Sequence, residues 1–270
     1  MILIADSGST TTEWRLIDGE RISQFQCMGL NPYMVDDKGI YEAISALNLP
    51  VEEILKLYFY GAGCGSTDKA AYVVSVLKRL FPVAEVFVHS DLLAAARSLL
   101  QHKEGVIGIL GTGSNVAHYS NPIVKPFATS TGYLLGDEGS GNALGKRLLR
   151  AFFYDKLDDE LSLKISSDKS VILHQLYSHS YPNRYLASYA NMMFRNRNHP
   201  QIAQLIQSTF DEWVENCLLP YEIKEIALCG SIAYYFHSEL KRSCASHGIR
   251  VNAVVEKPIA ALALYHKAYE

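Results

Sequence analysis

The stretch ILIADSGSTTT (residues 2–12) determines how this chain is interpreted, because an apolar run leads directly into a turn of small and hydroxyl residues. A short apolar run that ends at such a turn is typical of a buried β-strand. The same plan returns in IGILGTGSN (residues 107–115). The sequence therefore predicts two related halves, each of which opens with a buried strand and a tight turn.

The first half alternates between strands and helices after that opening. A three-stranded antiparallel meander is expected first, with a turn at Asp18 and Gly19. Apolar spacing and Pro or Gly breaks then predict strands at 1–6, 13–17, 21–27, 55–60 and 84–89, and helices at 36–47, 67–81 and 91–100. Antiparallel strands followed by such alternation predict an α/β lobe with a mixed sheet and flanking helices.

The second half repeats this logic around a mostly helical stretch from 131 to 217. Strands are expected at 105–110, 115–119, 225–228 and 250–255, and helices at 200–217, 232–241 and 259–269. The pattern predicts an N-terminal lobe at 1–103, joined by a last helix at 258–270, and a C-terminal lobe at 104–257.

Composition excludes several classes of partner. A formal net charge of -3 and the absence of a long Lys/Arg run argue against nucleic acid and favour a small molecule. Five cysteines with no CxxC pair fit neither a disulfide framework nor a zinc site. Since no signal-peptide core opens the chain and no apolar run reaches the roughly 18 residues that span a membrane, we expect a cytoplasmic protein without membrane contact.

The two related turns are candidates for holding phosphate. Backbone N–H groups and hydroxyls gathered in such a turn are natural ligands for phosphate oxygens, and Asp6 at the end of the first strand is a candidate for Mg²⁺ through water. A plain Ser/Thr-rich hairpin is the alternative for the first turn, but two like turns favour a nucleotide such as ATP. The candidate residues are Gly8, Ser9, Thr10, Thr11, Gly111, Thr112 and Gly113.

A third small turn, at Gly230 and Ser231, lies between an expected strand and an expected helix. Glycine there allows the adenosine of ATP to lie close to the backbone, although an ordinary strand-to-helix turn is equally consistent. No GxxxxGK[ST] phosphate loop exists, because Gly141 and Gly145 before Lys146 have only three residues between them.

Asp91 is the candidate general base for phosphoryl transfer. It follows an expected strand and begins an expected helix, where mixed sheets gather reactive groups. Transfer to a hydroxyl needs alignment, charge neutralisation and a carboxylate that receives the proton. A helix cap by Asp91 or by Ser90 is the alternative, and the two roles are compatible.

Amide, carboxylate and aromatic residues near tight turns suit a sugar, whose hydroxyls need oriented donors and acceptors. Asp137 and Glu138 have an alternative role in the first turn of the following helix, through its dipole. The candidate sugar-binding residues are Asn31, Ser114, Asn115, Gly132, Tyr133, Asp137 and Glu138.

With these motifs in order, the chain resembles the N-acetylglucosamine kinase branch of the BadF/BadG/BcrA/BcrD ATPase family, in the actin, Hsp70 and sugar-kinase superfamily. The similarity runs over nearly the whole chain. GTGS at 111–114 matches the family's second phosphate motif without change, and GDEGS at 136–140 matches its sugar-binding segment. Thr11 stands where the family's opening motif has Lys or Arg, and Tyr133 stands where it has Trp.

The resemblance implies a fold, a reaction and partners. The fold would be the two-lobed, actin-like ATPase (ribonuclease H-like) fold with the active site in the inter-lobe cleft. The enzyme would use ATP and Mg²⁺ to phosphorylate an amino sugar, N-acetylglucosamine first, at the 6-hydroxyl. Asp91 would accept the proton, Asn31 would bind the sugar, and lobe closure would exclude water. Such kinases are often homodimers.

Other acceptors and other classes stay open. N-acetylmuramic acid, its anhydro form and glucosamine are alternative sugars, because four arginines are candidates for a lactyl carboxylate: Arg147, Arg184, Arg195 and Arg197. A nucleotide-binding sensor without catalysis is a further alternative.

A second class with this fold is the ATPase activators of acyl-CoA dehydratases and reductases, which need exposed cysteines for an iron–sulfur cluster. Cys217 is expected on the apolar stripe of helix 200–217, and Cys229 next to the third turn. These expected positions disfavour an activator.

Overall fold

The computed structural model describes residues 1–166 and 168–269. The chain divides into two compact units. Unit 1 comprises Met1–Glu104, Tyr119–Val124 and Lys257–Glu270, and unit 2 comprises Gly105–His118 and Lys125–Glu256. Residue 270, the last residue of the helix expected at 258–270, lies outside the described residues. The domain boundaries expected at 103 and 257 stay a prediction.

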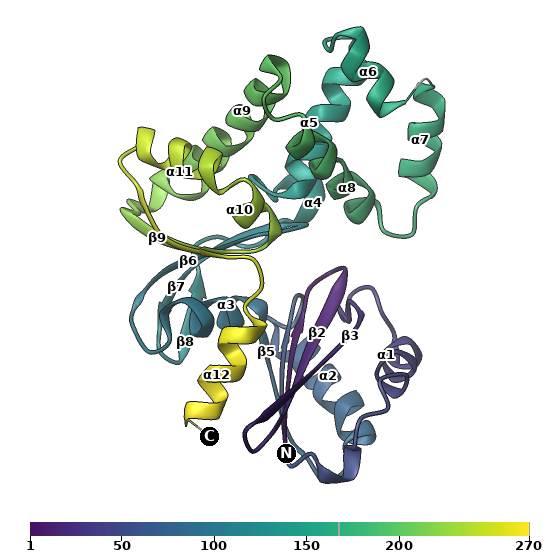
Figure 1. The fold of residues 1–270 in the computed structure, drawn as a ribbon, viewed down its shortest axis with the longest axis vertical. Helices are drawn as coiled ribbons and strands as arrows, with labels where there is room; N and C mark the ends of the chain where they lie inside the picture. Colours follow the sequence, from purple (N-terminus) through teal and green to yellow (C-terminus); the bar gives the residue numbers. More distant parts are fainter. Residues whose placement is uncertain (167, 270) are drawn as a thin grey trace. The chain divides into compact units, whose positions relative to one another are not determined.

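Unit 1 is built on a mixed sheet in the order β3-β2-β1-β4-β5 (Figure 1). Its strands are β1 (Ile2–Ser7), β2 (Thr11–Asp18), β3 (Arg21–Met28), β4 (Lys56–Gly61) and β5 (Glu85–Ser90). β1 pairs antiparallel with β2 and parallel with β4, and β4 runs parallel to β5. The antiparallel meander and the mixed sheet expected from the sequence are confirmed.

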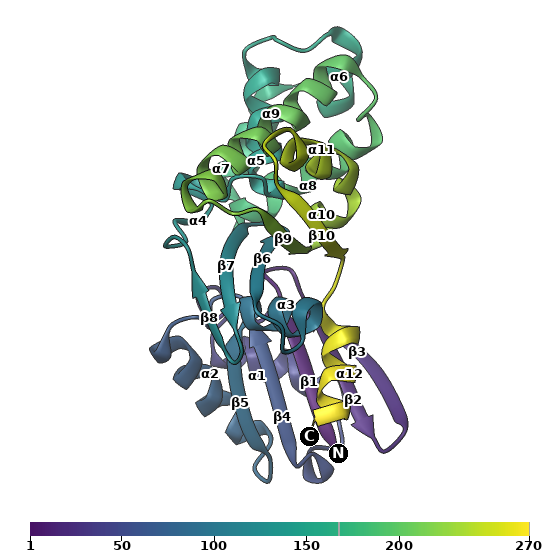
Figure 2. The same ribbon diagram turned by 90° about the vertical axis from the view of Figure 1, so that its left-hand side faces the viewer.

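Helices cover both faces of this sheet (Figures 1 and 2). One face carries α1 (Asp37–Ser45) and α2 (Thr67–Leu80), with the short 3-10 helix η1 (Val51–Glu53) between them in sequence. The other face carries α3 (Asp91–Leu100) and α12 (Ile259–Tyr269), which lie side by side. On that second face the Tyr60 hydroxyl lies 2.8 Å from Nε2 of the fully buried His266.

Strand alternation decides which side chains of β1 meet which helices. Leu3 and Ala5 join the core that includes Ile40 of α1 and Val76 of α2. Asp6 is offset by one residue from Ala5, so it points to the α3 face. The first carboxylate predicted from the sequence thus lies on the same face of the sheet as the helix that Asp91 begins.

Unit 2 contains a second sheet in the order β10-β9-β6-β7-β8. Its strands are β6 (Gly105–Leu110), β7 (Ser114–Ser120), β8 (Ile123–Pro126), β9 (Glu225–Cys229) and β10 (Arg250–Val255). Counted from each opening strand, both sheets have the order third, second, first, fourth, fifth, with the fourth strand parallel to the first. The repeat predicted from residues 2–12 and 107–115 therefore extends to the topology of two whole sheets.

Helices of unit 2 pack over its sheet and enclose a large apolar core (Figure 1). Gly145 allows α5 and α8 to approach closely, because a Cβ there would lie 2.0 Å from the carbonyl oxygen of Leu186. The helices are α4 (Gly132–Leu135), α5 (Gly141–Phe153), α6 (Asp159–Ile165), α7 (Lys169–Ser178), α8 (Pro182–Arg195), α9 (Pro200–Cys217), η2 (Leu219–Tyr221), α10 (Ser231–Tyr235) and α11 (His237–Ser246).

Two elements differ from the sequence prediction. The short strand β8 was not predicted, because four residues beside Pro122 carry no clear alternation. The helix expected at 232–241 is two helices, α10 and α11, that meet at Phe236. The ring of Phe236 is 1% exposed and packs edge-on against Phe194 and Phe210, so the break in the helix allows this ring to enter the core.

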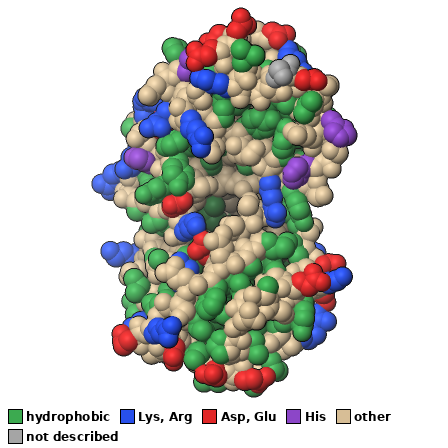
Figure 3. Space-filling view, turned by 45° about the vertical axis from the view of Figure 1, so that its right-hand side comes forward, with side chains coloured by type: hydrophobic (Ala, Val, Ile, Leu, Met, Phe, Trp, Pro, Cys, Tyr) green, Lys and Arg blue, Asp and Glu red, His purple; other side chains and the backbone are tan. Residues whose placement is uncertain are grey.

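Lys, Arg, Asp and Glu side chains of both signs are spread over the face drawn in Figure 3. Within residues 1–166 and 168–269, no helix is long and apolar enough to span a membrane.

Candidate functional site

The first turn predicted for phosphate is held by buried hydroxyls. Ser7 and Thr12 are fully buried, and their hydroxyl oxygens lie 2.8 Å apart. Ser7 Oγ also accepts the Leu30 N–H at 3.0 Å. The Gly8 N–H donates to the Thr11 carbonyl at 2.9 Å, which closes the turn. The predicted residues therefore lie at the tip of a rigid turn, less buried than its base: Gly8, Ser9, Thr10 and Thr11.

Gly29, which follows β3, packs against this turn and was not predicted from the sequence. A Cβ at Gly29 would lie 2.5 Å from the carbonyl oxygen of Gly8 and 2.6 Å from the carbonyl carbon of Ser9. The Gly29 N–H donates to the Thr10 carbonyl at 2.9 Å. Only glycine permits this close approach of the chain after β3, which a single sequence cannot reveal.

Asp6 and Asp91 lie at the carboxyl ends of the parallel strands β1 and β5, at the same edge of the sheet in unit 1. Asp6 is the last but one residue of β1, and Asp91 follows β5 directly. Burial raises the pKa of the Asp6 carboxyl to about 7, and the charges of Asp91 and Glu13 contribute to the rise. Burial also raises the pKa of the Asp91 carboxyl. Carboxylates that repel one another in a poorly hydrated place are stabilised by a proton or by a cation.

The capping alternative for this position is also present. Ser90 is the N-cap of α3, and its Oγ accepts the Leu93 N–H at 3.4 Å. Asp91 Oδ1 accepts the Leu92 N–H at 2.9 Å. Because Ser90 provides the cap, the Asp91 carboxylate is not required for it and is available to a reacting group.

The second turn predicted for phosphate is fixed by the start of α5. Backbone N–H groups of Gly141 and Asn142 donate to the carbonyls of Gly111 and Thr112 at 2.9 and 3.1 Å. A Cβ at Gly111 would meet nothing within 4 Å. This turn therefore lies against α5 on one side and is open on another, as a ligand-binding turn must be.

Asp137 connects this turn to the segment predicted to bind sugar. Its Oδ1 accepts the Ser114 N–H at 3.2 Å, and its Oδ2 accepts Nδ2 of Asn142 at 3.3 Å. Asp137 has a left-handed backbone (φ +60°), a costly conformation for a residue other than glycine and one that is common at functional sites. Burial raises the pKa of its carboxyl. Asp137 and Glu138 precede the N-cap Ser140, so the helix-dipole alternative does not describe their positions.

Asn142 was missed by the sequence analysis. Its Nδ2 donates to both the Thr112 carbonyl and the Asp137 carboxylate, so one side chain ties the phosphate turn to the acid. Asn142 is 1% exposed, and within the described chain its Oδ1 has no hydrogen-bond partner. In the sequence, the only feature that could have drawn attention to Asn142 is its position two residues after Ser140, the end of the predicted sugar-binding segment.

The third turn, predicted for adenosine, needs glycine for a structural reason. Gly230 has a φ of +115°, and a Cβ there would lie 2.3 Å from the Leu110 carbonyl oxygen. Its N–H donates to the Val255 carbonyl at 3.0 Å. Gly230 therefore packs directly on the end of β6 beside Gly111, while Ser231 begins α10.

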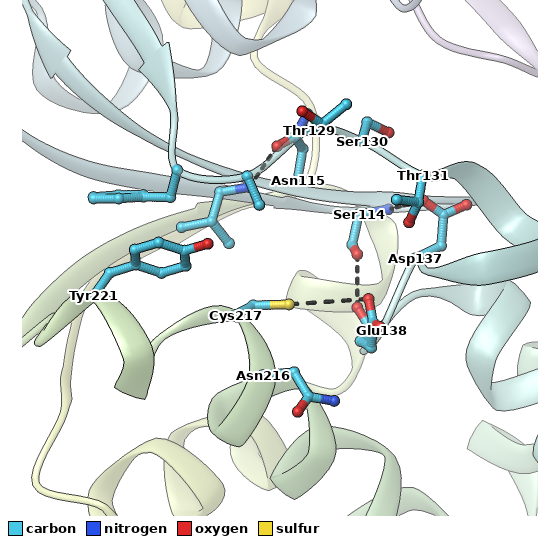
Figure 4. Close-up of a pocket in the computed structure, with 13 residues that line it drawn as sticks. Ser114, Asn115, Thr129, Ser130, Thr131, Asp137, Glu138, Asn216, Cys217 and Tyr221 are labelled. Carbon is cyan, nitrogen blue, oxygen red and sulfur yellow. Dashed lines mark hydrogen bonds between the residues drawn. The ribbon is translucent and has the colours of Figure 1, made fainter.

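A pocket of about 80 Å³ with polar and apolar walls lies within unit 2 (Figure 4). Four of the predicted sugar-binding residues line it: Ser114, Asn115, Asp137 and Glu138. The other lining residues were not predicted and come from β7, the loop after β8, the end of α9 and η2: Val116, Phe127, Ala128, Thr129, Ser130, Thr131, Asn216, Cys217 and Tyr221. The hydroxyl-rich run ATST (128–131) is the feature of the sequence from which these residues could have been predicted.

The remaining predicted sugar-binding residues lie elsewhere. Asn31 belongs to unit 1, is 8% exposed, and accepts the Tyr33 N–H with its Oδ1 at 3.0 Å. Gly132 begins α4 with a φ of +69°, and Tyr133 packs against the core of unit 2. Neither Gly132 nor Tyr133 lines the pocket.

Direct metal ligation by a cluster of protein groups is not seen. Among residues 1–166 and 168–269, no three His, Cys, Asp or Glu side chains are grouped closely enough to hold a metal ion. A lone carboxylate such as Asp6 remains compatible with Mg²⁺, because this ion keeps several waters and binds through one or two carboxylates together with substrate phosphates.

Comparison with known proteins gives one sequence relative and many structural ones. No family model matches the chain. An N-acetylmuramic acid/N-acetylglucosamine kinase of Clostridium acetobutylicum is 25% identical over 127 residues, which are 46% of this chain and 42% of that enzyme. The match thus spans less than half of the curated relative.

Solved structures match over the full length. A Porphyromonas gingivalis protein, provisionally described as an N-acetylglucosamine kinase, superposes with a TM-score of 0.92 and 29% identity over 100% of this chain and 99% of the other. A ROK family glucokinase from Streptomyces griseus, solved with glucose and AMPPNP, superposes with a TM-score of 0.62 and 13% identity over 98% of this chain and 97% of the other. The predicted actin-like, sugar-kinase fold is confirmed.

Proposed function

We propose that this chain is an ATP-dependent kinase that transfers a phosphoryl group to the 6-hydroxyl of an amino sugar, most directly N-acetylglucosamine. The observation that carries the proposal is the repeated strand–turn–strand opening of the two sheets. The buried carboxyl of Asp6 and a pocket lined by Asp137 and Glu138 support it. The full-length likeness to a protein described as an N-acetylglucosamine kinase supports the choice of sugar.

The two turns are suited to the phosphates of ATP. Within the described chain, the backbone N–H groups of Thr112 and Gly113 make no hydrogen bond, so they are available as donors to phosphate oxygens. The tip of the first turn adds the Thr10 and Thr11 hydroxyls. Gly230 and Ser231 are proposed to lie beside the adenosine, where the close packing of Gly230 on the end of β6 keeps the backbone of this turn next to Gly111.

Asp91 is proposed to accept the proton of the sugar hydroxyl. The burial that raises its pKa makes it a better proton acceptor than an ordinary surface carboxylate. Asp6 is proposed to hold Mg²⁺ through water, and the bound ion would neutralise charge on the phosphates. Asn31 and the residues of the pocket are proposed to orient the sugar.

An ATPase activator of an acyl-CoA enzyme is less well supported. That role needs exposed cysteines for an iron–sulfur cluster. Three of the cysteines are buried and two are partly buried: Cys64, Cys229 and Cys244, then Cys27 and Cys217. Iron and acid-labile sulfide in the purified protein would favour the activator instead.

The first test is an ADP-release assay with ATP, Mg²⁺ and a panel of sugars. The panel contains N-acetylglucosamine, N-acetylmuramic acid, glucosamine, N-acetylmannosamine and glucose. ADP release that requires an N-acetylated sugar, with a sugar 6-phosphate as product, is the expected result. Release without sugar favours the activator, and no release with tight ATP binding favours a sensor.

The second test replaces the proposed base. Asp91→Asn should lower kcat by about 10²- to 10⁴-fold, which is the usual contribution of a general base, while ATP binding persists. Asp68→Asn is the matched control, because Asp68 also lies in the first turn of a helix of unit 1 but is exposed. Full activity of Asp91→Asn would remove Asp91 from the mechanism.

A homodimer is proposed only from the resemblance to related kinases. Light scattering at micromolar concentration, with and without sugar, decides between one copy and two.

A further inference from the structure

We propose that Glu138 is a specificity-determining residue, which makes the pocket of unit 2 accept a neutral substituent of the sugar and reject an anionic one. The inference rests on the proposed kinase function and goes beyond it, because it selects among the amino sugars that the sequence left open.

Charge in the pocket is of one sign. Two carboxylates, Asp137 and Glu138, line it, and its other lining residues are hydroxyl, amide, thiol or apolar groups without any Lys, Arg or His. Asp137 is already engaged by the Ser114 N–H and by Asn142. The Glu138 carboxylate makes neither of these hydrogen bonds, so its charge acts directly on a group that enters the pocket.

Glu138 is held in place by the pocket wall (Figure 4). The Ser114 hydroxyl donates to the backbone carbonyl of Glu138 at 2.6 Å. The Cys217 thiol lies 4.0 Å from Glu138 Oε2, as a weak donor from the end of α9. Burial raises the pKa of Cys217 to about 12, with the charge of Glu138 adding to the rise, so the thiol stays protonated at neutral pH. The backbone of Glu138 is thus held at the pocket wall, and its half-buried carboxylate faces the Cys217 thiol.

The arginines that the sequence offered for a lactyl carboxylate do not reach this pocket. Arg147 forms an ion pair with Glu212, and Arg197 lies over the Phe194 ring, 4.2 Å from its centroid. Arg184 lies over the Tyr181 ring at 4.1 Å. Neither these three residues nor Arg195 is among the lining residues. An acid that entered would meet two acidic residues and no cation among the residues that line the pocket.

Size also limits what can enter. A cavity needs about 10–15 Å³ of such volume to hold one water, so about 80 Å³ accommodates a substituent of a few heavy atoms and not a second sugar ring. Phe127 and Tyr221, whose ring centroids are 5.0 Å apart, form an apolar wall. Hydroxyl and amide groups opposite can hydrogen-bond a short amide. A neutral acylamino group fits this description. N-acetylmuramic acid carries the same group, but its lactyl carboxylate, attached through the adjacent ring carbon, would then lie beside the two acids of the pocket.

The test compares kcat/KM for N-acetylglucosamine and N-acetylmuramic acid. The expected ratio for the wild type is about 100 or more in favour of the neutral sugar, since like charges a few ångströms apart in a partly buried site repel strongly. Glu138→Gln should lower the ratio at least tenfold. Glu215→Gln, an exposed residue of the same helix as Cys217 that does not line the pocket, should leave the ratio unchanged.

A second measurement does not depend on any variant. Raising the salt concentration from low to about 0.5 M should reduce the wild-type ratio, because salt screens partly exposed charges. A wild-type ratio near one, or a ratio unchanged in a folded Glu138→Gln protein, overturns the inference and leaves the kinase intact. Phosphorylation of neither sugar overturns the proposed kinase function, and the inference with it.

Discussion

Two glycines of unit 2 are expected to have different roles. Gly230 is needed for packing in the folded chain, whereas Gly111 is proposed to be needed for binding ATP. Both lie at the ends of adjacent strands in unit 2. A Cβ at Gly230 would lie 2.3 Å from the Leu110 carbonyl oxygen, and its φ of +115° suits only glycine. A Cβ at Gly111 would meet no atom of the chain within 4 Å. Gly230→Ala should therefore destabilise unit 2, and Gly111→Ala should not.

The expected magnitude for Gly230→Ala follows from three contributions. The left-handed backbone costs about 1–3 kcal/mol for alanine, and displacing a backbone carbonyl in a packed region costs about 1–3 kcal/mol. The lower entropy of the unfolded alanine chain offsets about 0.4–1 kcal/mol of this cost. The net loss is about 1–6 kcal/mol, which lowers Tm by about 2–20 °C for a unit of this size.

Calorimetry of the wild type and the two variants measures the stability, and titration with ATP measures the affinity. Gly111→Ala should keep the wild-type Tm within about 2 °C but bind ATP at least tenfold more weakly, because its methyl group occupies the open side of the turn. A Gly230→Ala protein as stable as the wild type would refute the steric reasoning. Unchanged ATP affinity in Gly111→Ala would remove this turn from the nucleotide site.

Three further predictions use the same structure. Gly145→Ala should lower Tm although alanine favours helices, because its Cβ would lie 2.0 Å from the Leu186 carbonyl oxygen; a higher Tm by calorimetry would contradict this. Burial, with the Arg97 charge, lowers the pKa of His89 to about 4. As the pH falls below the pKa of His89 in the unfolded chain, the unfolded chain binds a proton that the folded chain does not. The free energy of unfolding of the wild type, relative to that of His89→Gln, should therefore fall between pH 7 and pH 5 in urea titrations. A difference that stays constant over this range would argue against it. Burial raises the pKa of Cys64 to about 12, so mass spectrometry at pH 8 should find this thiol unalkylated by iodoacetamide until denaturant is added; rapid labelling of the folded protein would be the contrary result.

Much of the fold could be predicted because local patterns and tertiary structure agree. Strands β6 and β10 and helices α9 and α12 have the bounds expected from apolar spacing and from Pro or Gly breaks. The short strand β8 and the break at Phe236 could not be predicted. In both, pairing or burial of distant residues outweighs a weak local preference.

Part of the candidate site could also be predicted from the sequence, and part could not. Residue types and their order along the chain already indicated both phosphate turns, Asp91 and the segment 136–140, because this chemistry needs small turn residues and carboxylates at the ends of strands. Whether those residues carry out the reaction is a proposal for experiment.

Other properties depend on contacts between residues far apart in the sequence. The sequence shows that Asp137, Glu138 and Cys217 exist, but only the fold brings the end of α9 to residue 138 and leaves the arginines outside the pocket. Likewise, glycine is needed at 29, 145 and 230 because a Cβ there would lie 2.0–2.5 Å from a backbone oxygen of another segment. Local sequence patterns reflect which side chains of a segment are exposed to water and which backbone conformation the segment prefers. The charge and shape of a pocket depend on how distant segments pack together, which only the tertiary structure determines.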